Sequence, residues 1–217
     1  MARTRRRVPT NLDPTQWAEK AARLIADEEV VSFAQARHKL SRSFGVGGRD
    51  LPDNRAIYSA LTRYQALYGG TAHRELIHSR RRSALEAMEN FEIFRPRLAG
   101  PVLYGTATRS VPVSLHLVSD TSEAVAMSLA NMRIPADLGV ETLSFGRQHL
   151  EEIPFFSTVR DGLGYELLVF PSQLSRAPCS EVDGKPMRRV TIKQLSLLLA
   201  NSPDFIAYDL KDLDRLW

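Results

Sequence analysis

The sequence has little cysteine, which limits the chemistry that it can carry. Cys179 is the single cysteine among 217 residues, so the chain cannot form an internal disulfide or a cysteine-rich metal site. It lies in a loop-like stretch between Pro178 and Ser180, without a basic or histidine partner beside it to favour a thiolate. We therefore interpret Cys179 as a bystander thiol.

Long apolar runs are also missing. The apolar segments are strand-sized or interrupted by polar residues, whereas a membrane-spanning helix needs about 20 apolar residues. The basic N-terminus is not followed by the apolar region of a secretory signal. The sequence therefore predicts a protein without a membrane partner, and cytoplasmic is the default localisation.

Three catalytic motifs are absent. The glycine-rich run from Gly45 to Gly48 lacks the Gly-Lys-Ser/Thr ending of a P-loop, and it follows a predicted helix instead of a strand. The sequence contains no HExxH pattern for zinc. A hydrolase could be imagined from Ser114 and His116, but no GxSxG nucleophile elbow supports it.

Acidic residues are missing from the first ten positions, where four arginines stand at Arg3, Arg5, Arg6 and Arg7. These four charges equal the net charge of +4 of the whole chain, so its basic character is largely that of a tail over residues 1–10. A flexible basic arm can bind nucleic acid by releasing counterions from the phosphates. A solvated terminus is the alternative, and the sequence leaves both open.

Residues 11–76 have the pattern of a helical region. Capping residues stand at Asp13, Ser32 and Asp53, each followed by apolar residues at helical spacing. The helix after Ser32 is basic and could lie on a phosphate backbone through Arg37, His38, Lys39 and Arg42. Because acids at 27–29 stand close by, a solvated helix face is the favoured interpretation.

A further helix is predicted from Thr71 to Phe94. Its expected buried positions are Leu76, Leu85, Met88 and Phe91. Three consecutive arginines, at 80–82, are offset by nearby glutamates, and Arg82 with Glu86 has the i,i+4 spacing of a surface ion pair.

The rest of the chain has strand patterns separated by turns. The predicted strands lie at 102–104, 113–118, 140–145, 153–159 and 165–170. Short helices are predicted at 122–132 and 191–199, and Asp161-Gly162 suits a hairpin between the last two strands. The fold class is therefore α+β, with an N-terminal helical region followed by a small mixed β-sheet and flanking helices. We divide the chain into the tail, a helical region over 11–76, an α/β core over 77–201 and a C-terminal segment over 202–217.

Three of these strands carry a pattern of small and polar residues. Gly105-Thr106 follows the first strand, Ser114 and His116 share one face of the second, and Glu166 lies on a later strand. This arrangement resembles the signature of the polymerase-beta-like nucleotidyltransferase superfamily. There the strand ends in Gly-Ser, the next strand carries Asp-hydrophobic-Asp, and a later strand carries a third carboxylate. The resemblance covers roughly residues 77–201, and it requires the strand of Ser114 and His116 to lie beside the strand of Glu166.

The chain departs from this signature where the family binds its metals. Ser114 and His116 stand in place of the two aspartates that hold two magnesium ions over the transferring phosphoryl group. A hydroxyl and an imidazole are poor substitutes for carboxylates as magnesium ligands. The resemblance therefore implies a degenerate member in which two-metal nucleotidyl transfer is lost. Alternatively, Ser114 and His116 are simply the solvated face of a strand.

Three hypotheses of function follow. In the first, the protein binds a nucleotide or an RNA phosphate without transferring anything. The residues assigned to phosphate binding are Gly105, Thr106, Thr108, Arg109, Arg188 and Arg189. In the second, it is an active nucleotidyltransferase with His116 and Glu166 as catalytic residues of an altered metal site, with Asp120 as a possible addition, and only this hypothesis implies Mg²⁺. In the third, it is a protein-interaction module without a ligand pocket.

Overall fold

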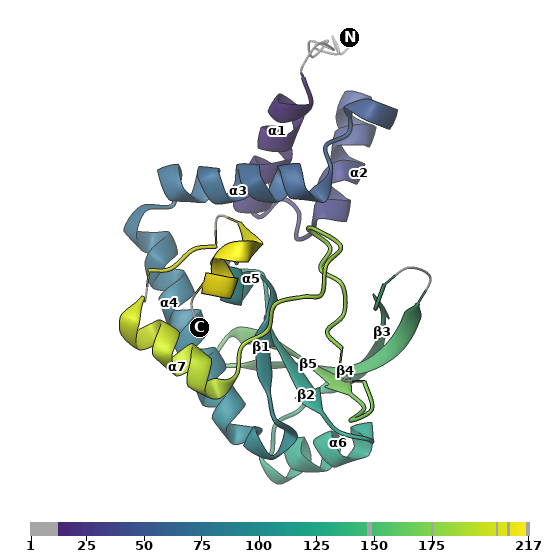
Figure 1. Ribbon diagram of the computed structural model, residues 1–217, viewed down its shortest axis with the longest axis vertical. Helices are drawn as coiled ribbons and strands as arrows, with labels where there is room; N and C mark the ends of the chain where they lie inside the picture. The colour runs from purple at the N-terminus through teal and green to yellow at the C-terminus, as the bar shows by residue number, and fades with distance from the viewer. Residues whose placement is uncertain (1–12, 147–148, 175, 203, 208, 216–217) are drawn as a thin grey trace, which may run out of the picture. The chain divides into compact units, whose positions relative to one another are not determined.

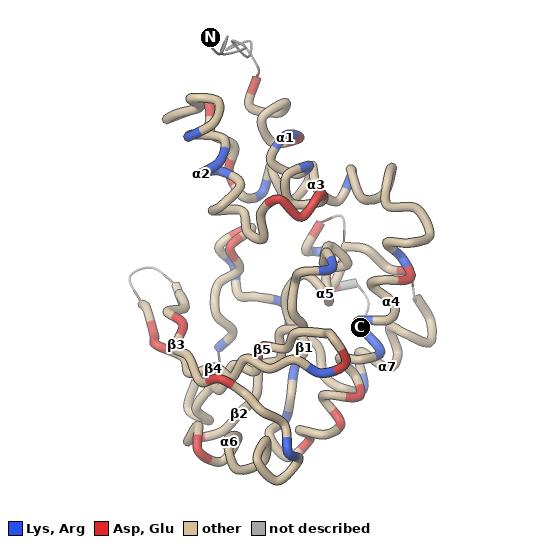
Figure 2. The backbone as a smooth tube through the Cα atoms, turned by 180° about the vertical axis from the view of Figure 1, so that it is seen from behind, with Lys and Arg blue, Asp and Glu red and all other residues tan. Residues whose placement is uncertain are grey.

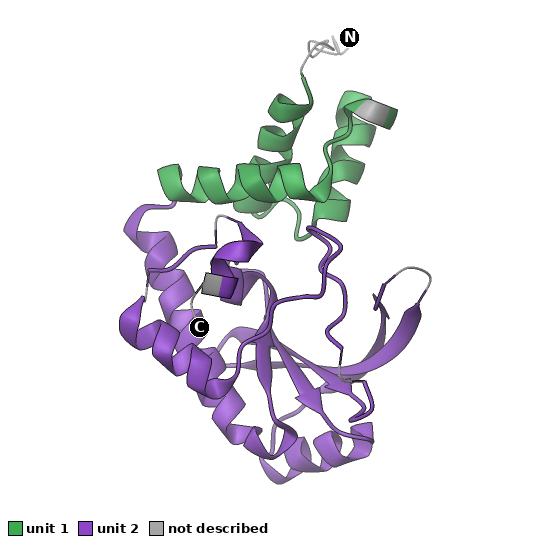
Figure 3. Ribbon diagram, viewed as in Figure 1, with its two compact units in different colours: residues 1–68 green, residues 69–217 purple. Residues whose placement is uncertain are grey.

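The computed structural model describes residues 13–146, 149–174, 176–202, 204–207 and 209–215. The chain forms two compact units, residues 1–68 and residues 69–217 (Figure 3). The division after Tyr68 lies earlier in the chain than the boundary that the sequence analysis placed before Ile77. The predicted basic tail at residues 1–10 lies outside the described residues. No helix in the described ranges has the length and apolar character needed to cross a membrane.

Unit 1 contains helices α1 (Pro14–Ala26), α2 (Phe33–Phe44) and α3 (Asn54–Tyr68), with a short 3-10 helix at Gly48–Asp50. All three predicted capping residues act as expected. The side chain of Asp13 accepts from the backbone N–H of Gln16, that of Ser32 from Gln35 and that of Asp53 from Ala56. The helices enclose a core that includes Trp17, Ala21, Leu40, Ile57 and Leu61. Local capping and apolar spacing together therefore account for this unit.

Unit 2 begins with the long helix α4 (Gly70–Asn90) and a 3-10 helix at Glu92–Phe94, and a five-stranded sheet follows (Figure 1). Its strands are β1 (Arg97–Ala99), β2 (Val113–Val118), β3 (Asp137–Ser144), β4 (Leu150–Arg160) and β5 (Leu163–Phe170). Its other helices are α5 (Gly100–Tyr104), α6 (Ser122–Asn131), α7 (Ile192–Asn201) and a 3-10 helix at Leu210–Arg215. The strand order is β1-β2-β5-β4-β3, and only β2 and β5 are parallel. The predicted α+β class with a mixed sheet is confirmed.

The predicted strand at 102–104 is wrong, because these residues belong to the helix α5. Pro101 in the first turn is compatible with a helix start, and Gly100 enters it with φ of +73°. The strand that precedes β2 is instead the three-residue β1, which pairs antiparallel with β2. Its shortness leaves no periodic pattern in the sequence.

The buried side of α4 also differs from the prediction. Leu76 and Leu85 are half-buried, whereas Arg80 and Arg81 are buried. Arg81 is fully enclosed and donates to the backbone carbonyls of Val102, Leu103 and Phe205. Burial lowers its pKa to about 10. Arg82, the one of the three arginines for which a surface ion pair was expected, is exposed, whereas Arg80 and Arg81 point inward and donate to backbone carbonyls.

Period-two alternation gives the sheet two distinct faces. The face that bears Leu115, Leu117 and Leu167 packs under helices, because Leu167 lines a recess together with residues of α4 and α6. The opposite face bears Ser114, His116, Glu166, Leu168 and Phe170. We call this second surface the site face. The last part of it packs against Phe145, Ile153 and Leu174, and Leu174 belongs to the chain that follows β5.

Candidate functional site

The parallel pairing of β2 with β5 brings three of the predicted site residues to one surface. Ser114 lies directly opposite Glu166, and His116 lies opposite Leu168, so all three polar residues share the site face. The arrangement that the sequence comparison requires, with the strand of Ser114 and His116 beside the strand of Glu166, is present. The site can therefore be built from β2 and β5 outward.

The glycine that follows the strand before β2 is Gly100, not Gly105. β1 ends at Ala99, and Gly100 then turns the chain into α5. A Cβ on Gly100 would lie 3.9 Å from the Cβ of Ser114, so the backbone at Gly100 adjoins the site face. Gly100-Pro101 therefore occupies the place in the topology that the sequence analysis gave to Gly105-Thr106.

The turn at Gly105-Thr106 is instead used to hold the fold together. The N–H groups of Gly105, Thr106 and Ala107 all donate to the carbonyl of Pro101, at 2.9, 2.9 and 3.2 Å. The side chains of Thr106 and Thr108 are buried. These backbone donors are therefore directed at a helix end and not at a ligand.

The C-terminal segment packs closely against Gly105 and covers the side from which a ligand would approach it. A Cβ at this glycine would lie 3.1 Å from the Cα of Ile206 and 3.2 Å from the carbonyl oxygen of Phe205. Its own carbonyl lies 2.9 Å from Nε2 of His73. Arg109 of the following turn is exposed, and its carbonyl accepts from Arg80.

His116 is enclosed in the site face and is neutral at neutral pH. Its side chain is 3 % exposed, and its ring lies 4.7 Å from that of Phe170, measured between centroids. Burial, with a smaller contribution from the charge of Arg189, lowers the pKa of His116 to about 3. Within the described residues its Nδ1 atom has no hydrogen-bond partner. His116 is thus poorly suited to proton transfer.

The magnesium ions that the transferase hypothesis implies do not fit these residues. Ser114 offers a hydroxyl, His116 is enclosed, and burial raises the pKa of Glu166. Asp120 lies past the far end of β2, where it accepts from the N–H and hydroxyl of Ser172. Across the described ranges, no three His, Cys, Asp or Glu side chains are grouped so that they could hold a metal ion.

Arg188, another predicted phosphate ligand, is already compensated by two acids. Its guanidinium lies 3.0 Å from a carboxylate oxygen of Asp183 and 3.4 Å from one of Asp214. Burial lowers the pKa of Arg188, but hydrogen bonds and charges from Asp214 and Asp183 raise it more. This arginine therefore serves to join the loop after β5 to the C-terminal segment.

Arg189 differs from Arg188 because no acid of the described residues forms a salt bridge with it. The antiparallel bridge between Leu98 and Val190 places Arg189 beside Ala99, on the side of the sheet that carries Ser114. Its guanidinium carbon lies 6.0 Å from the ring centroid of Phe170. Burial lowers the pKa of Arg189, and the positive charge of Arg97 lowers it further.

Arg97 is the site residue that the sequence analysis missed. It lies on β1 directly opposite His116, and its side chain is exposed on the site face. In the described part of the chain, neither Arg97 nor Arg189 has an acidic partner in a salt bridge. In the sequence it stands in Arg95-Pro96-Arg97. This pattern points to a site residue only once β1 is known.

The surface next to this arginine pair is made of small residues. Ala99 lies opposite Ser114, and Ser157 of β4 lies opposite Glu166. With Gly100 they form a floor in which Ala99 and Gly100 are buried and the two serines are half-buried. We call Arg97, Arg189, Ser114 and Glu166 with this floor the Arg97–Arg189 site. It places positive charge on the β1 side and one carboxyl group two strands away.

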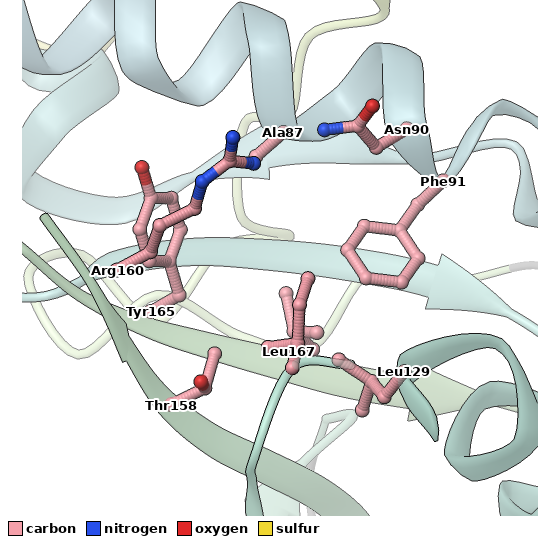
Figure 4. A pocket seen from close by; sticks show the side chains of 9 residues that line it. Ala87, Asn90, Phe91, Leu129, Thr158, Arg160, Tyr165 and Leu167 are labelled. Atoms are coloured by element: carbon pink, nitrogen blue, oxygen red, sulfur yellow. The ribbon is translucent and has the colours of Figure 1, made fainter. Parts of the chain in front are cut away.

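A recess lies on the opposite, helix-covered face of the sheet (Figure 4). Phe91, Leu129 and Leu167 line it, while Asn90 and Arg160 supply polar groups. Arg160 lies 3.6 Å from Asp161 through Nε. None of the residues that the sequence analysis assigned to a site lines this recess. It is therefore separate from the Arg97–Arg189 site.

The basic helix of unit 1, α2, turns most of its basic side chains to solvent, as the sequence analysis favoured. Lys39 pairs with Glu29 at 2.5 Å, while Arg37, His38 and Arg42 are exposed. Figure 2 marks the basic positions of α2 in blue. Comparison with known proteins adds no assignment for either unit. No protein-family model, no curated protein and no solved structure matches this chain.

Proposed function

We propose that unit 2 binds a phosphate group of a nucleotide or of RNA at the Arg97–Arg189 site, without metal-dependent transfer. The observation that carries this proposal is the placement of Arg97 and Arg189 on neighbouring backbone segments of one sheet face, without an acidic salt-bridge partner among the described residues. Two like charges held together are costly for the folded state. A bound phosphate relieves that cost and accepts several charge-assisted hydrogen bonds.

The surroundings of the pair favour a phosphate ester over a bulkier apolar ligand. Ser114 is half-buried on the site face beside Ala99, and its hydroxyl can donate to a phosphate oxygen. Glu166 lies beyond Ser114, so it can accept from a hydroxyl or amino group in the rest of the ligand. A nucleotide presents such groups beside its phosphate.

The resemblance to nucleotidyltransferases agrees with this proposal in its topology. The short strand β1 leads through Gly100, α5 and the turn that follows it into β2, and Ser114 on β2 lies opposite Glu166 on β5. The same comparison argues against transfer, because a hydroxyl and a buried neutral histidine stand where the family has its metal-binding aspartates. The proposed activity is therefore binding alone.

Calorimetric titration of the full chain tests the proposal with inorganic phosphate, ATP, CTP and a short RNA, each with and without Mg²⁺. We expect metal-independent binding of at least one phosphate ligand. Arg189→Met and Arg97→Gln should each weaken it by about 10-fold, or about 1.4 kcal/mol. Arg109→Gln, at an exposed arginine away from the site, should change the affinity by less than about 2-fold.

A further variant separates loss of binding from loss of fold. Arg97→Glu places an acid beside Arg189, which removes the repulsion and the anion site together. It should abolish phosphate binding while the melting temperature stays the same or rises. Binding that needs Mg²⁺ and is lost in Glu166→Ala would instead support the transferase hypothesis. Absence of binding to all four probes would refute the proposal.

A further inference from the structure

The outer strand of the sheet has an exposed backbone edge. β3 pairs with β4 along one side and ends the strand order, as Figure 1 shows. In the described ranges its other side is bonded at its last residue, where the carbonyl of Ser144 accepts from the N–H of Cys179 at 2.6 Å. β3 contains neither lysine nor proline, the residues that commonly protect an edge from pairing.

One face of this outer strand is apolar and open. Leu138 is 61 % exposed and Val140 is 62 % exposed, and period two places both on the same face. Pro154 of β4 lies opposite Val140 and extends the patch inward, and Leu150 of β4, 66 % exposed, lies on the same face. An edge strand with an apolar face is a template for another strand.

The direction of the backbone groups is known from the bond at Ser144. Because its carbonyl points away from β4, alternation along the strand points the N–H and C=O groups of Thr142, Val140 and Leu138 outward too. Leu138 and Val140, whose side chains form the apolar face, are therefore among the residues with outward-pointing backbone groups on this edge. Any strand that pairs with this edge therefore bonds to them.

We infer that β3 pairs with β3 of a second copy of this chain, antiparallel and centred on Val140. A two-fold axis between the two Val140 residues joins the two sheets edge to edge. It sets Val140 against Val140 of the second copy and Leu138 against Thr142 of the second copy. The backbone bonds and the apolar face are then continuous across the join.

The acidic residues select this register. Centring the pair on Gly139 would set Asp137 against Glu141 of the other copy, and centring it on Glu141 would set two glutamates against each other. Centring on Val140 instead sets each Glu141 against Gly139, which has no side chain. No acid then lies directly opposite another.

Sedimentation velocity on the full chain, between about 1 and 200 µM, tests whether the dimer forms. An edge-to-edge contact of this length is small, so we expect a dissociation constant in the micromolar range. Val140→Lys should shift the chain to monomer, because it sets two ammonium groups opposite each other. Val159→Lys, at a 67 % exposed valine of β4, is the matched control and should not. A monomer at every concentration, or a dimer that Val140→Lys leaves intact, would overturn the inference.

Cross-linking tests the register itself. In a Cys179→Ser background, Val140→Cys brings two thiols to an antiparallel pair with a Cα separation of about 5.5 Å, which a disulfide can span. We expect a disulfide dimer on mild oxidation. Leu143→Cys, which this register sets against Asp137, should cross-link far less. Equal cross-linking of the two variants would exclude the Val140-centred register.

Discussion

Ser114 on β2 and Glu166 on β5 lie directly opposite each other in a parallel register. The hydroxyl leaves Glu166 without a second acid beside it on that strand, and burial raises the pKa of this glutamate. The pair therefore presents one carboxyl group, two strands away from Arg97 on β1. The proposed ligand of this surface is accordingly an anion and not a metal cation.

Ser114→Asp should reverse the preference of the site. A second carboxyl group beside Glu166 adds negative charge close to the arginine pair, so phosphate affinity should fall by at least about 3-fold. Titration with Mn²⁺ should then detect cation binding that the original chain lacks. Ser157→Asp is the matched control, because Ser157 also faces Glu166 but lies further from Arg97. Unchanged phosphate affinity in Ser114→Asp would place the bound phosphate elsewhere.

The sequence predicted those elements whose signals are local. Asp13, Ser32 and Asp53 mark helix starts through bonds that span three residues, and the Asp161-Gly162 turn joins β4 to β5 with φ of +52° and +75°. The strand at Val113–Val118 was also recognised, because its apolar residues alternate over its whole length.

What the sequence missed depends on contacts between distant parts of the chain. β1 has three residues, too few for a period, so Arg97 was not assigned to the site. Arg188 is compensated by Asp183, five residues before it, and by Asp214, 26 residues after it, and only the structure shows that these acids pair with Arg188 and not with Arg189. Ser114 and Glu166 were brought together only through the family resemblance. Which residues lie beside them across the sheet could be seen only in the structure.

His116 should make stability depend on pH. Its pKa is about 3 in the folded chain and about 6.5 when unfolded, so the unfolded state binds the extra proton between these values. Stability is therefore lost as the pH falls below 6.5, by about 2 kcal/mol between pH 7 and pH 5. His116→Leu should remove this loss, as measured by urea unfolding at both pH values.

The same variant tests how much the unpartnered Nδ1 atom of His116 costs in stability. A buried polar atom without a hydrogen bond costs about 1–3 kcal/mol, which His116→Leu recovers, although the contact with Phe170 is lost. We expect the free energy of unfolding at pH 7 to be unchanged or higher. A clear loss at pH 7 would mean that His116 makes a stabilising interaction beyond its ring contact.

Arg81 should be essential for the stability of unit 2. Arg81→Met leaves the carbonyls of Val102, Leu103 and Phe205 without this donor, and we expect a loss of about 2–4 kcal/mol. Arg82→Met is the matched control on the next, exposed position and should cost less than about 0.5 kcal/mol. Thermal unfolding monitored by circular dichroism compares them. Equal effects would contradict the role of Arg81 as a buried link.

A substitution at Gly105 tests whether its turn binds phosphate or only supports the fold. Its φ of +84° disfavours a side chain by about 1–2 kcal/mol, and the close approach of Phe205 and Ile206 adds a steric cost. Gly105→Ala should therefore destabilise the fold more than Gly162→Ala, since Gly162 has φ of +75° but nothing within 4 Å of its Cβ position. Below the melting temperature, Gly105→Ala should keep the phosphate affinity of the original chain, because the proposed ligand lies at Arg97 and Arg189. If calorimetry instead shows a selective loss of phosphate binding without a loss of stability, the turn at Gly105 belongs to the binding site after all.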